Sequence, residues 1–184
     1  MFGKQIMFVR SPMHLHLIGI NPALVNAWFD AFADFPEVEI QHGDLLNVAH
    51  GCIVSPANSY GFMDGGIDAA YRDFFGLEIE KTVQAAIAVR PEGLLPVGAC
   101  IIVPTGNPRI PHLIVAPTMV MPEMVESLNC QRAMRAVLRI ARQHPDLCSH
   151  IYCPGLATGV GRVPPEIAAL EMAQAYRDWK ALAE

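Results

Sequence analysis

Apolar and polar residues follow two patterns along the chain, and the two patterns alternate over most of its length. Short apolar runs bounded by Gly, Pro or Asn are typical of buried strands. Longer stretches with apolar residues at i, i+3, i+4 and i+7 are typical of helices that dock one face on a core. The runs that predict strands are residues 6–9, 15–20, 38–41, 52–54, 97–103, 113–116 and 150–153.

The predicted helices lie between these runs and carry start and stop signals. Asn21 and Pro22 are an N-cap and a first-turn proline, which together predict the start of the first helix. Its apolar stripe consists of Val25, Trp28, Phe29 and Phe32. Further helices are predicted over residues 67–76, 79–87, 129–143 and from about 164 onward. In the last of these, Tyr176 and Trp179 fall on the apolar stripe and are expected to pack in the core.

Two histidines in the second predicted strand raise the question of a metal site. His14 and His16 lie two positions apart, so their side chains share one face of the strand. Two imidazoles could ligate a metal ion, but the sequence shows no third ligand beside them. We therefore expect a solvated strand face and no metal site.

Strands that alternate with helices predict an α/β sandwich with helices on both faces of the sheet. In such sheets ligands bind beyond the carboxyl ends of the strands. Three features lie there: Gly43-Asp44-Leu45, the loop of residues 58–66 and the loop of residues 155–162. The loops of residues 104–112 and 117–126 could also line a cleft.

The two glycine-bearing loops each lead into a predicted helix, an arrangement that presents backbone N–H groups to an anion. Together they could cradle a diphosphate, with Asp44 reading a base at one end. The residues leave simpler interpretations open: a tight connection without a ligand, a turn-forming role for Asp44, and a first-turn acid at Asp68 that the helix dipole stabilises.

Composition and charge narrow the classes of function. The chain of 184 residues fits one domain, and its net charge of −5 argues against a protein that grips nucleic acid by its phosphates. The stripe of Arg132, Arg135, Arg139 and Arg142 has no interleaved aromatic residues, so we expect a solvated face.

No apolar run approaches the roughly 20 residues that span a bilayer. None of the five cysteines forms a Cys-x-x-Cys pair. We expect a cytoplasmic protein without a cofactor and without membrane contact.

Three segments resemble motifs of the macrodomain family, whose fold recognises ADP-ribose. Gly43-Asp44-Leu45 resembles the family's Gly-Asp-Ile, and residues 55–68 resemble its Asn-Ala-Ala-Asn, glycine run and Val-Asp. Ala157-Thr158-Gly159-Val160 resembles its diphosphate loop. The motifs occur in the family order and span most of the chain. The resemblance implies a three-layer α/β/α sandwich with a mixed central sheet of six or seven strands, as a single macrodomain-like domain over residues 1–184.

The resemblance also implies roles for individual residues. Asp44 would bind the adenine amino group, and Leu45 belongs to the same part of the site. Asn58 would orient the distal ribose, and Asp68 would orient or activate a water against it, so these two are the candidate catalytic residues. The other candidate ligand-binding residues are Ala57, Asp64, Gly65, Gly66, Ile67, Ala157, Thr158, Gly159, Val160, Gly161 and Arg162.

The chain departs from the family pattern at several positions. Ser55 and Pro56 begin the first motif where the family has Asn-Ala, and Met63 and Asp64 replace two glycines. Gly161 stands where an aromatic normally packs on the distal ribose. The segment Thr-Gly-Val-Gly-Arg-Val-Pro is similar to that of phage and bacterial members described as phosphatase-like or tail-associated.

The function implied is binding of ADP-ribose or a close derivative, free or on an ADP-ribosylated protein. Hydrolysis of an ADP-ribosyl ester or of ADP-ribose phosphate is the reaction expected. One alternative is a non-catalytic ADP-ribose reader. Another, less favoured, is a nucleic-acid-binding protein that uses the arginine stripe.

Overall fold

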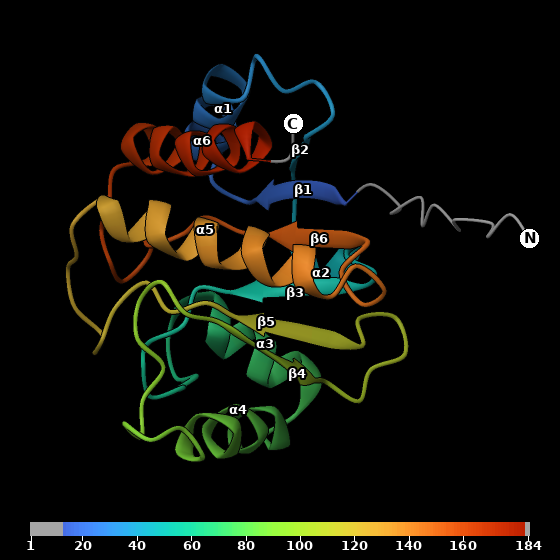
Figure 1. The fold of residues 1–184 in the computed structure, drawn as a ribbon, viewed down its shortest axis with the longest axis vertical. Coiled ribbons are helices and arrows are strands. Elements are labelled where there is room, and N and C mark those ends of the chain that lie inside the picture. The colour runs from blue at the N-terminus through green and yellow to red at the C-terminus, as the bar shows by residue number, and fades with distance from the viewer. Residues whose placement is uncertain (1–12, 183–184) are drawn as a thin grey trace, which may run out of the picture.

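The computed structural model describes residues 13–182, which form one six-stranded sheet with helices on both faces (Figure 1). The strand order is β2-β1-β6-β3-β5-β4. Strand β4 pairs antiparallel with β5 at one edge, whereas the other neighbouring strands are parallel, so the mixed sheet is confirmed. The strands are β1 (His14–Gly19), β2 (Glu39–His42), β3 (Cys52–Ser55), β4 (Ile101–Pro104), β5 (His112–Val115) and β6 (His150–Cys153).

The helices form the two outer layers of the sandwich. They are α1 (Pro22–Ala31), α2 (Leu45–Val48), α3 (Gly66–Phe75), α4 (Glu78–Ala88), α5 (Leu128–Gln143) and α6 (Pro165–Ala181). Helices α1, α5 and α6 pack on one face of the sheet, and α2, α3 and α4 contribute to the core on the other. The described residues contain no helix that is long and apolar enough to cross a membrane.

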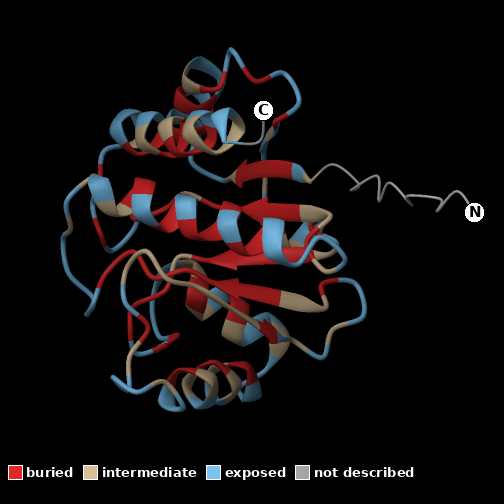
Figure 2. Ribbon diagram, in the orientation of Figure 1, coloured by how far each residue is buried: buried red, intermediate tan, exposed pale blue. Residues whose placement is uncertain are grey.

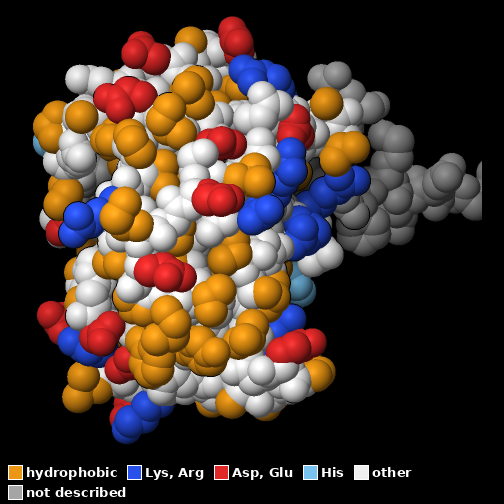
Figure 3. Space-filling view, turned by 90° about the vertical axis from the view of Figure 1, so that its left-hand side faces the viewer, with side chains coloured by type: hydrophobic (Ala, Val, Ile, Leu, Met, Phe, Trp, Pro, Cys, Tyr) orange, Lys and Arg blue, Asp and Glu red, His pale blue; other side chains and the backbone are white. Residues whose placement is uncertain are grey.

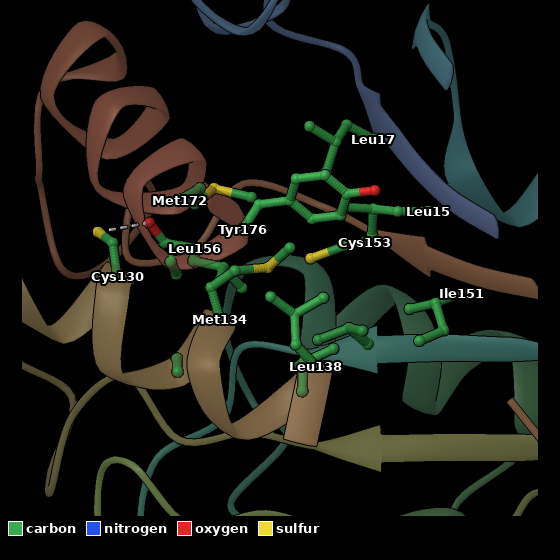
Figure 4. Close-up of a cluster of buried hydrophobic side chains, with 14 of the residues drawn as sticks. Leu15, Leu17, Cys130, Met134, Leu138, Ile151, Cys153, Leu156, Met172 and Tyr176 are labelled. Carbon is green, nitrogen blue, oxygen red and sulfur yellow. Dashed lines mark hydrogen bonds between the residues drawn. The ribbon is translucent and has the colours of Figure 1, made fainter. Parts of the chain in front are cut away.

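The core under α5 and α6 joins side chains from strands and helices that are far apart in sequence (Figure 4). Leu15 of β1 and Ile151 of β6 point into it from the sheet, and Met134 and Tyr176 point into it from the helices. All four are buried, as are most strand residues in Figure 2. Tyr176 therefore packs in the core as predicted, rather than in a ligand site.

The core on the other face fixes the start of α3. Tyr71 of α3 is fully buried, and its hydroxyl donates a 2.9 Å hydrogen bond to the Val54 carbonyl in β3. Ile79, Val83 and Ile87 dock α4 beside it at the predicted helical spacing. This packing holds the loop between β3 and α3 against the end of the sheet, where the candidate site lies.

Several local predictions are corrected. The strand expected over residues 97–103 begins only at Ile101, because Gly98 turns the chain with a φ of +92°. Phe29 of the expected apolar stripe is 55% exposed. Helix α2 was not predicted, since its four residues are too short to show a helical period. The predicted strand over residues 6–9 lies outside the described residues.

The expectation of a solvated face at His14 and His16 is wrong for His16, which is only 6% exposed. Its ring stacks on Tyr152 of β6 with 4.3 Å between ring centroids and 3° between the ring planes. Strand β6 lies beside β1, so residues from more than a hundred positions away cover this histidine. The helix start at Asn21 is confirmed, because its side chain accepts a 2.9 Å hydrogen bond from the Ala23 amide.

Candidate functional site

A cleft of about 530 Å³ opens beyond the carboxyl ends of β1, β3 and β6. These strands run parallel, so the segments that follow them meet at one edge of the sheet. Figure 3 looks onto this edge of the molecule. The walls come from parts of five segments, within residues 18–24, 43–45, 56–70, 118–122 and 154–160. The cleft is large enough for a small organic ligand.

Most of the site residues predicted from the sequence line this cleft. They are Asp44, Leu45, Asn58, Asp64, Gly65, Gly66, Ile67, Asp68, Ala157, Thr158, Gly159 and Val160. Ala57, Gly161 and Arg162 are not among the lining residues. Ala57 is buried behind the loop, and Gly161 lies under Ala157.

The structure adds residues that the sequence analysis missed. Ile20 and Asn21 follow β1 directly and line the cleft, as do Phe62 and Gly155. The strand-end rule that identified Asp44 could also have found Ile20 and Asn21. Thr118, Met119 and Pro122 confirm that the loop of residues 117–126 borders the cleft. The loop of residues 104–112 contributes no lining residue, so that part of the prediction is wrong.

Asn58 organises the loop that follows β3. It is 6% exposed, and its Oδ1 accepts hydrogen bonds from the amides of Tyr60 and Phe62 at 3.1 and 3.2 Å. Its Nδ2 donates to the Phe62 carbonyl at 2.8 Å. The side chain therefore folds the turn that brings Phe62 to the mouth of the cleft. Glu80 of α4 holds the next residue by accepting a 2.8 Å bond from the Met63 amide.

The start of α3 presents unused backbone donors to the cleft. Gly66 has a φ of +57°, a left-handed conformation that glycine adopts without strain. Within residues 13–182, the amides of Gly65, Gly66 and Ile67 donate to no protein group. The positive end of the helix dipole adds to these donors. This end of the cleft is therefore suited to an oxyanion.

The second loop presents a matching set of donors. Ala157 adopts a φ of +58°, and its carbonyl accepts a 3.0 Å hydrogen bond from the Val163 amide, which closes the loop. Across the described chain, the amides of Thr158, Gly159 and Val160 donate to no protein group. Both loops line the same cleft, so two sets of amides without protein partners lie along its walls.

Asp68 is the buried carboxyl of the site. It lies in the first turn of α3, is 6% exposed and accepts a 2.6 Å hydrogen bond from the Ser55 hydroxyl. Burial raises the pKa of Asp68 to about 7, and the hydrogen bond from Ser55 opposes that rise. A carboxyl with this pKa can take or give a proton near neutral pH.

Asp44 also lines the cleft, and it begins a helix. Its Oδ1 accepts a 2.9 Å hydrogen bond from the Leu46 amide, so it is the N-cap of α2. The structure therefore confirms the local structural role of Asp44 that the sequence left open. The side chain is exposed and lines the cleft, which leaves carboxylate lone pairs for a donor on a ligand.

The chemistry of the cleft follows from its lining. No Lys or Arg of the described residues lines it, so an anion there would depend on backbone amides and the α3 dipole. Hydrophobic side chains gather on the same face in Figure 3, and Phe62 and Val160 are among the exposed ones. Apolar walls, two sets of amides and an exposed carboxylate suit a ligand with a planar ring and a phosphate chain.

Fold and site together define an α/β sandwich protein with a cleft at the carboxyl edge of a mixed sheet. A sequence model of the Macro domain matches residues 54–172, about two thirds of the chain. The chain belongs to the Macro domain family.

Two relatives align with this chain over about three quarters of its length. A protein of Aquifex aeolicus described as uncharacterized is 34% identical over 146 residues, which cover 78% of this chain and 83% of the relative. The "Macro domain-containing protein in gbd 3'region" of Cupriavidus necator is 30% identical over 135 residues, 72% of this chain and 75% of the relative.

Solved macrodomains share the fold at lower sequence identity. The macrodomain of Mycobacterium tuberculosis DarG aligns with a TM-score of 0.64 at 21% identity, covering 74% of this chain and 87% of that one. The Oceanobacillus iheyensis macrodomain, solved with ADP, aligns with a TM-score of 0.63 at 23% identity, covering 74% and 72%. Thermosipho africanus DarTG, solved in complex with ADP-ribose, aligns with a TM-score of 0.59 at 14% identity, covering 73% and 37%.

Proposed function

We propose that the cleft binds ADP-ribose or a close derivative. The observation that carries this proposal is the pair of amide sets, at the start of α3 and in the loop of residues 157–160, that face one cleft. Two adjacent anion-binding segments match a diphosphate better than a single phosphate. The solved macrodomains that hold ADP or ADP-ribose share this fold.

The proposed ligand runs along the cleft from Asp44 to Asp68. The carboxylate of Asp44 accepts from the adenine amino group, with Leu45 beside it. The diphosphate lies between Gly65, Gly66 and Ile67 on one side and the loop of residues 157–160 on the other. The distal ribose reaches the end of the cleft at Asn58 and Asp68.

Hydrolysis of an ADP-ribosyl ester or of ADP-ribose phosphate is the reaction we assign to this site. Asp68, with a pKa of about 7, orients or activates a water against the distal ribose. The nearby amides hold the phosphates and so fix the ribose for attack. An ADP-ribosylated protein is the corresponding macromolecular substrate.

A non-catalytic reader is the second candidate, and the arrangement of Asn58 favours it. Both polar atoms of this side chain already bond to its own loop, which leaves one amide hydrogen to orient a ribose. The arginine stripe gives the nucleic-acid alternative little support, because Arg135 pairs with Asp178 and Arg139 donates to the Gly98 carbonyl.

Calorimetric titration of the protein with ADP-ribose tests the binding proposal. We expect saturable heat, and no heat at millimolar ligand would overturn it. Incubation with ADP-ribose phosphate and with a protein ADP-ribosylated on acidic residues then tests the reaction. Release of product that Asp68→Ala abolishes supports an enzyme, whereas binding without turnover of either substrate supports a reader.

A further inference from the structure

One aromatic side chain borders the cleft without belonging to a hydrophobic core. Of the described residues that line the cleft, Phe62 alone is aromatic. It is 42% exposed and is a member of neither core cluster. Single exposed apolar residues are common on protein surfaces, so exposure alone assigns no role to this ring. What sets Phe62 apart is its place in the cleft and the way in which its backbone is held.

The backbone around Phe62 is fixed at three successive residues. The Asn58 side chain accepts from the Phe62 amide at 3.2 Å and donates to the Phe62 carbonyl at 2.8 Å. Gly61 has a φ of +74°, and a Cβ there would lie 2.7 Å from a side-chain carbon of α4, so the turn packs closely on that helix. Met63 is buried and donates its amide to Glu80. The exposed ring is therefore carried on a preorganised backbone, which lowers the entropic cost of a contact with a ligand.

The order of the strands separates Phe62 from Asp44. Asp44 follows β2, whereas Phe62 follows β3, which lies three places further along the sheet. Neighbouring strands are about 4.8 Å apart, so these two strands are about 14 Å apart. Asn58, which holds Phe62, also pairs with Met119, a residue that follows β5 on the side of β3 away from β2. A ligand whose base lies at Asp44 therefore meets Phe62 with its far end.

We propose that Phe62 packs on the distal ribose and so selects ADP-ribose over nucleotides that end at the diphosphate. This inference rests on the proposed ADP-ribose site, in which Asn58 and Asp68 lie at the distal ribose. A ribose presents C–H groups as well as hydroxyls. The phenyl ring covers the C–H groups, while the two polar residues serve the hydroxyls. ADP has no distal ribose and leaves the ring in water, so the ring strengthens the binding of ADP-ribose alone.

Calorimetric titration of wild type and Phe62→Ala, each with ADP-ribose and with ADP, tests this role. We expect Phe62→Ala to bind ADP-ribose about 3- to 10-fold more weakly than wild type and to bind ADP equally well. Phe62→Trp keeps a flat apolar ring, so it should retain the affinity for ADP-ribose. Its fluorescence should shift with ADP-ribose, beyond any shift of wild type, and should not shift with ADP.

Phe74→Ala is the matched control for the loss of an exposed phenyl ring. Phe74 is 41% exposed, lies in α3 and does not line the cleft. This variant should bind both ligands like wild type, and thermal melts of all the variants check that each is folded.

The outcomes separate this role from the proposed function. If wild type binds ADP-ribose but Phe62→Ala binds it equally well, or loses affinity for ADP-ribose and ADP alike, the role of Phe62 is overturned and the ADP-ribose site stands. Where ADP gives too little heat to compare, the fluorescence of Phe62→Trp decides, and no shift with ADP-ribose overturns the role. If wild type binds no ADP-ribose, the proposed function fails and this inference fails with it.

Discussion

The Ser55 hydroxyl donates a 2.6 Å hydrogen bond to the Asp68 carboxyl, and both side chains are almost fully buried, with Asp68 lining the cleft. Ser55 closes β3 and Asp68 opens α3, so the bond ties the end of a strand to the first turn of a helix. Ser55 is also a departure from the family motif. The carboxyl that we propose to act on the distal ribose is therefore tuned by a residue that departs from the family motif.

Replacement of Ser55 by Ala is expected to raise the pKa of Asp68 further above its ordinary range. The hydroxyl stabilises the ionised carboxyl, and burial acts without opposition once it is gone. Loss of a hydrogen bond to a charged group corresponds to a pKa change of about one pH unit. NMR titration of the Asp68 carboxyl measures it. Ser59→Ala is the control, since Ser59 is buried but bonds to the Met119 carbonyl; equal pKa values in the two variants would contradict the assignment.

Asp68 is also expected to make stability depend on pH. An aspartate carboxyl ordinarily has a pKa of 3.8, whereas the pKa of Asp68 in the folded protein is about 7. Between these values the folded protein holds a proton that the unfolded chain has lost. The free energy of unfolding therefore falls as the pH rises from about 4 to about 7 and levels off above that. Asp68→Asn has no carboxyl at this position, so its free energy of unfolding should not decrease over this pH range. At pH 8 it should be more stable than wild type by about 2–4 kcal/mol.

Urea unfolding of both proteins at several pH values checks this prediction. The histidines contribute equally to wild type and Asp68→Asn, so the difference between the two curves isolates the carboxyl. The difference should shrink toward zero near pH 4. A constant difference across the range would show that Asp68 is ionised throughout in the folded state.

Gly161 is expected to tolerate no side chain, although it stands where the family carries an aromatic. A Cβ built at this position would lie 2.6 Å from the Ala157 carbonyl oxygen, a backbone atom of the second loop. Gly161→Ala must therefore displace the loop, which we expect to cost about 1–3 kcal/mol of stability and to weaken ADP-ribose binding. At Gly159 a Cβ meets nothing within 4 Å, so Gly159→Ala is the matched control for stability only, because Gly159 also lines the cleft. Thermal melts of the two variants measure the cost in stability, and calorimetry of Gly161→Ala measures its affinity for ADP-ribose. Equal melting of the two variants would contradict the steric argument.

The amide sets of the site could be predicted because they depend on chain order alone. A strand that ends in a glycine-bearing loop before a helix presents its amides at the carboxyl edge, and this rule predicted the loops of residues 58–66 and 155–162. The resemblance to the macrodomain motif then narrowed the second loop to residues 157–160. The same rule, applied to the first strand, would have found Ile20 and Asn21. Phe62 could not be found in this way, because the side chain of Asn58 folds the turn that brings it to the cleft.

Contacts between distant segments could not be predicted from the sequence. The burial of His16 depends on Tyr152 and His150, which strand order places beside β1. The sequence shows that His14 and His16 share a face but not which residues cover it. Periodicity likewise fixed the position of helix α1 but not the exposure of Phe29, because the width of the buried stripe depends on what packs against the helix.

Asp44 has two roles that substitution can separate. As the N-cap of α2 it accepts from the Leu46 amide, and as a proposed ligand contact it lines the cleft. Asp44→Ala should lose about 1 kcal/mol of stability together with ADP-ribose affinity. Asp44→Ser keeps a capping oxygen but no longer reaches the adenine, so we expect near wild-type melting with affinity reduced about tenfold or more. If calorimetry instead finds that Asp44→Ser binds ADP-ribose as tightly as wild type, the carboxylate is only a cap, and the base is held by the apolar walls.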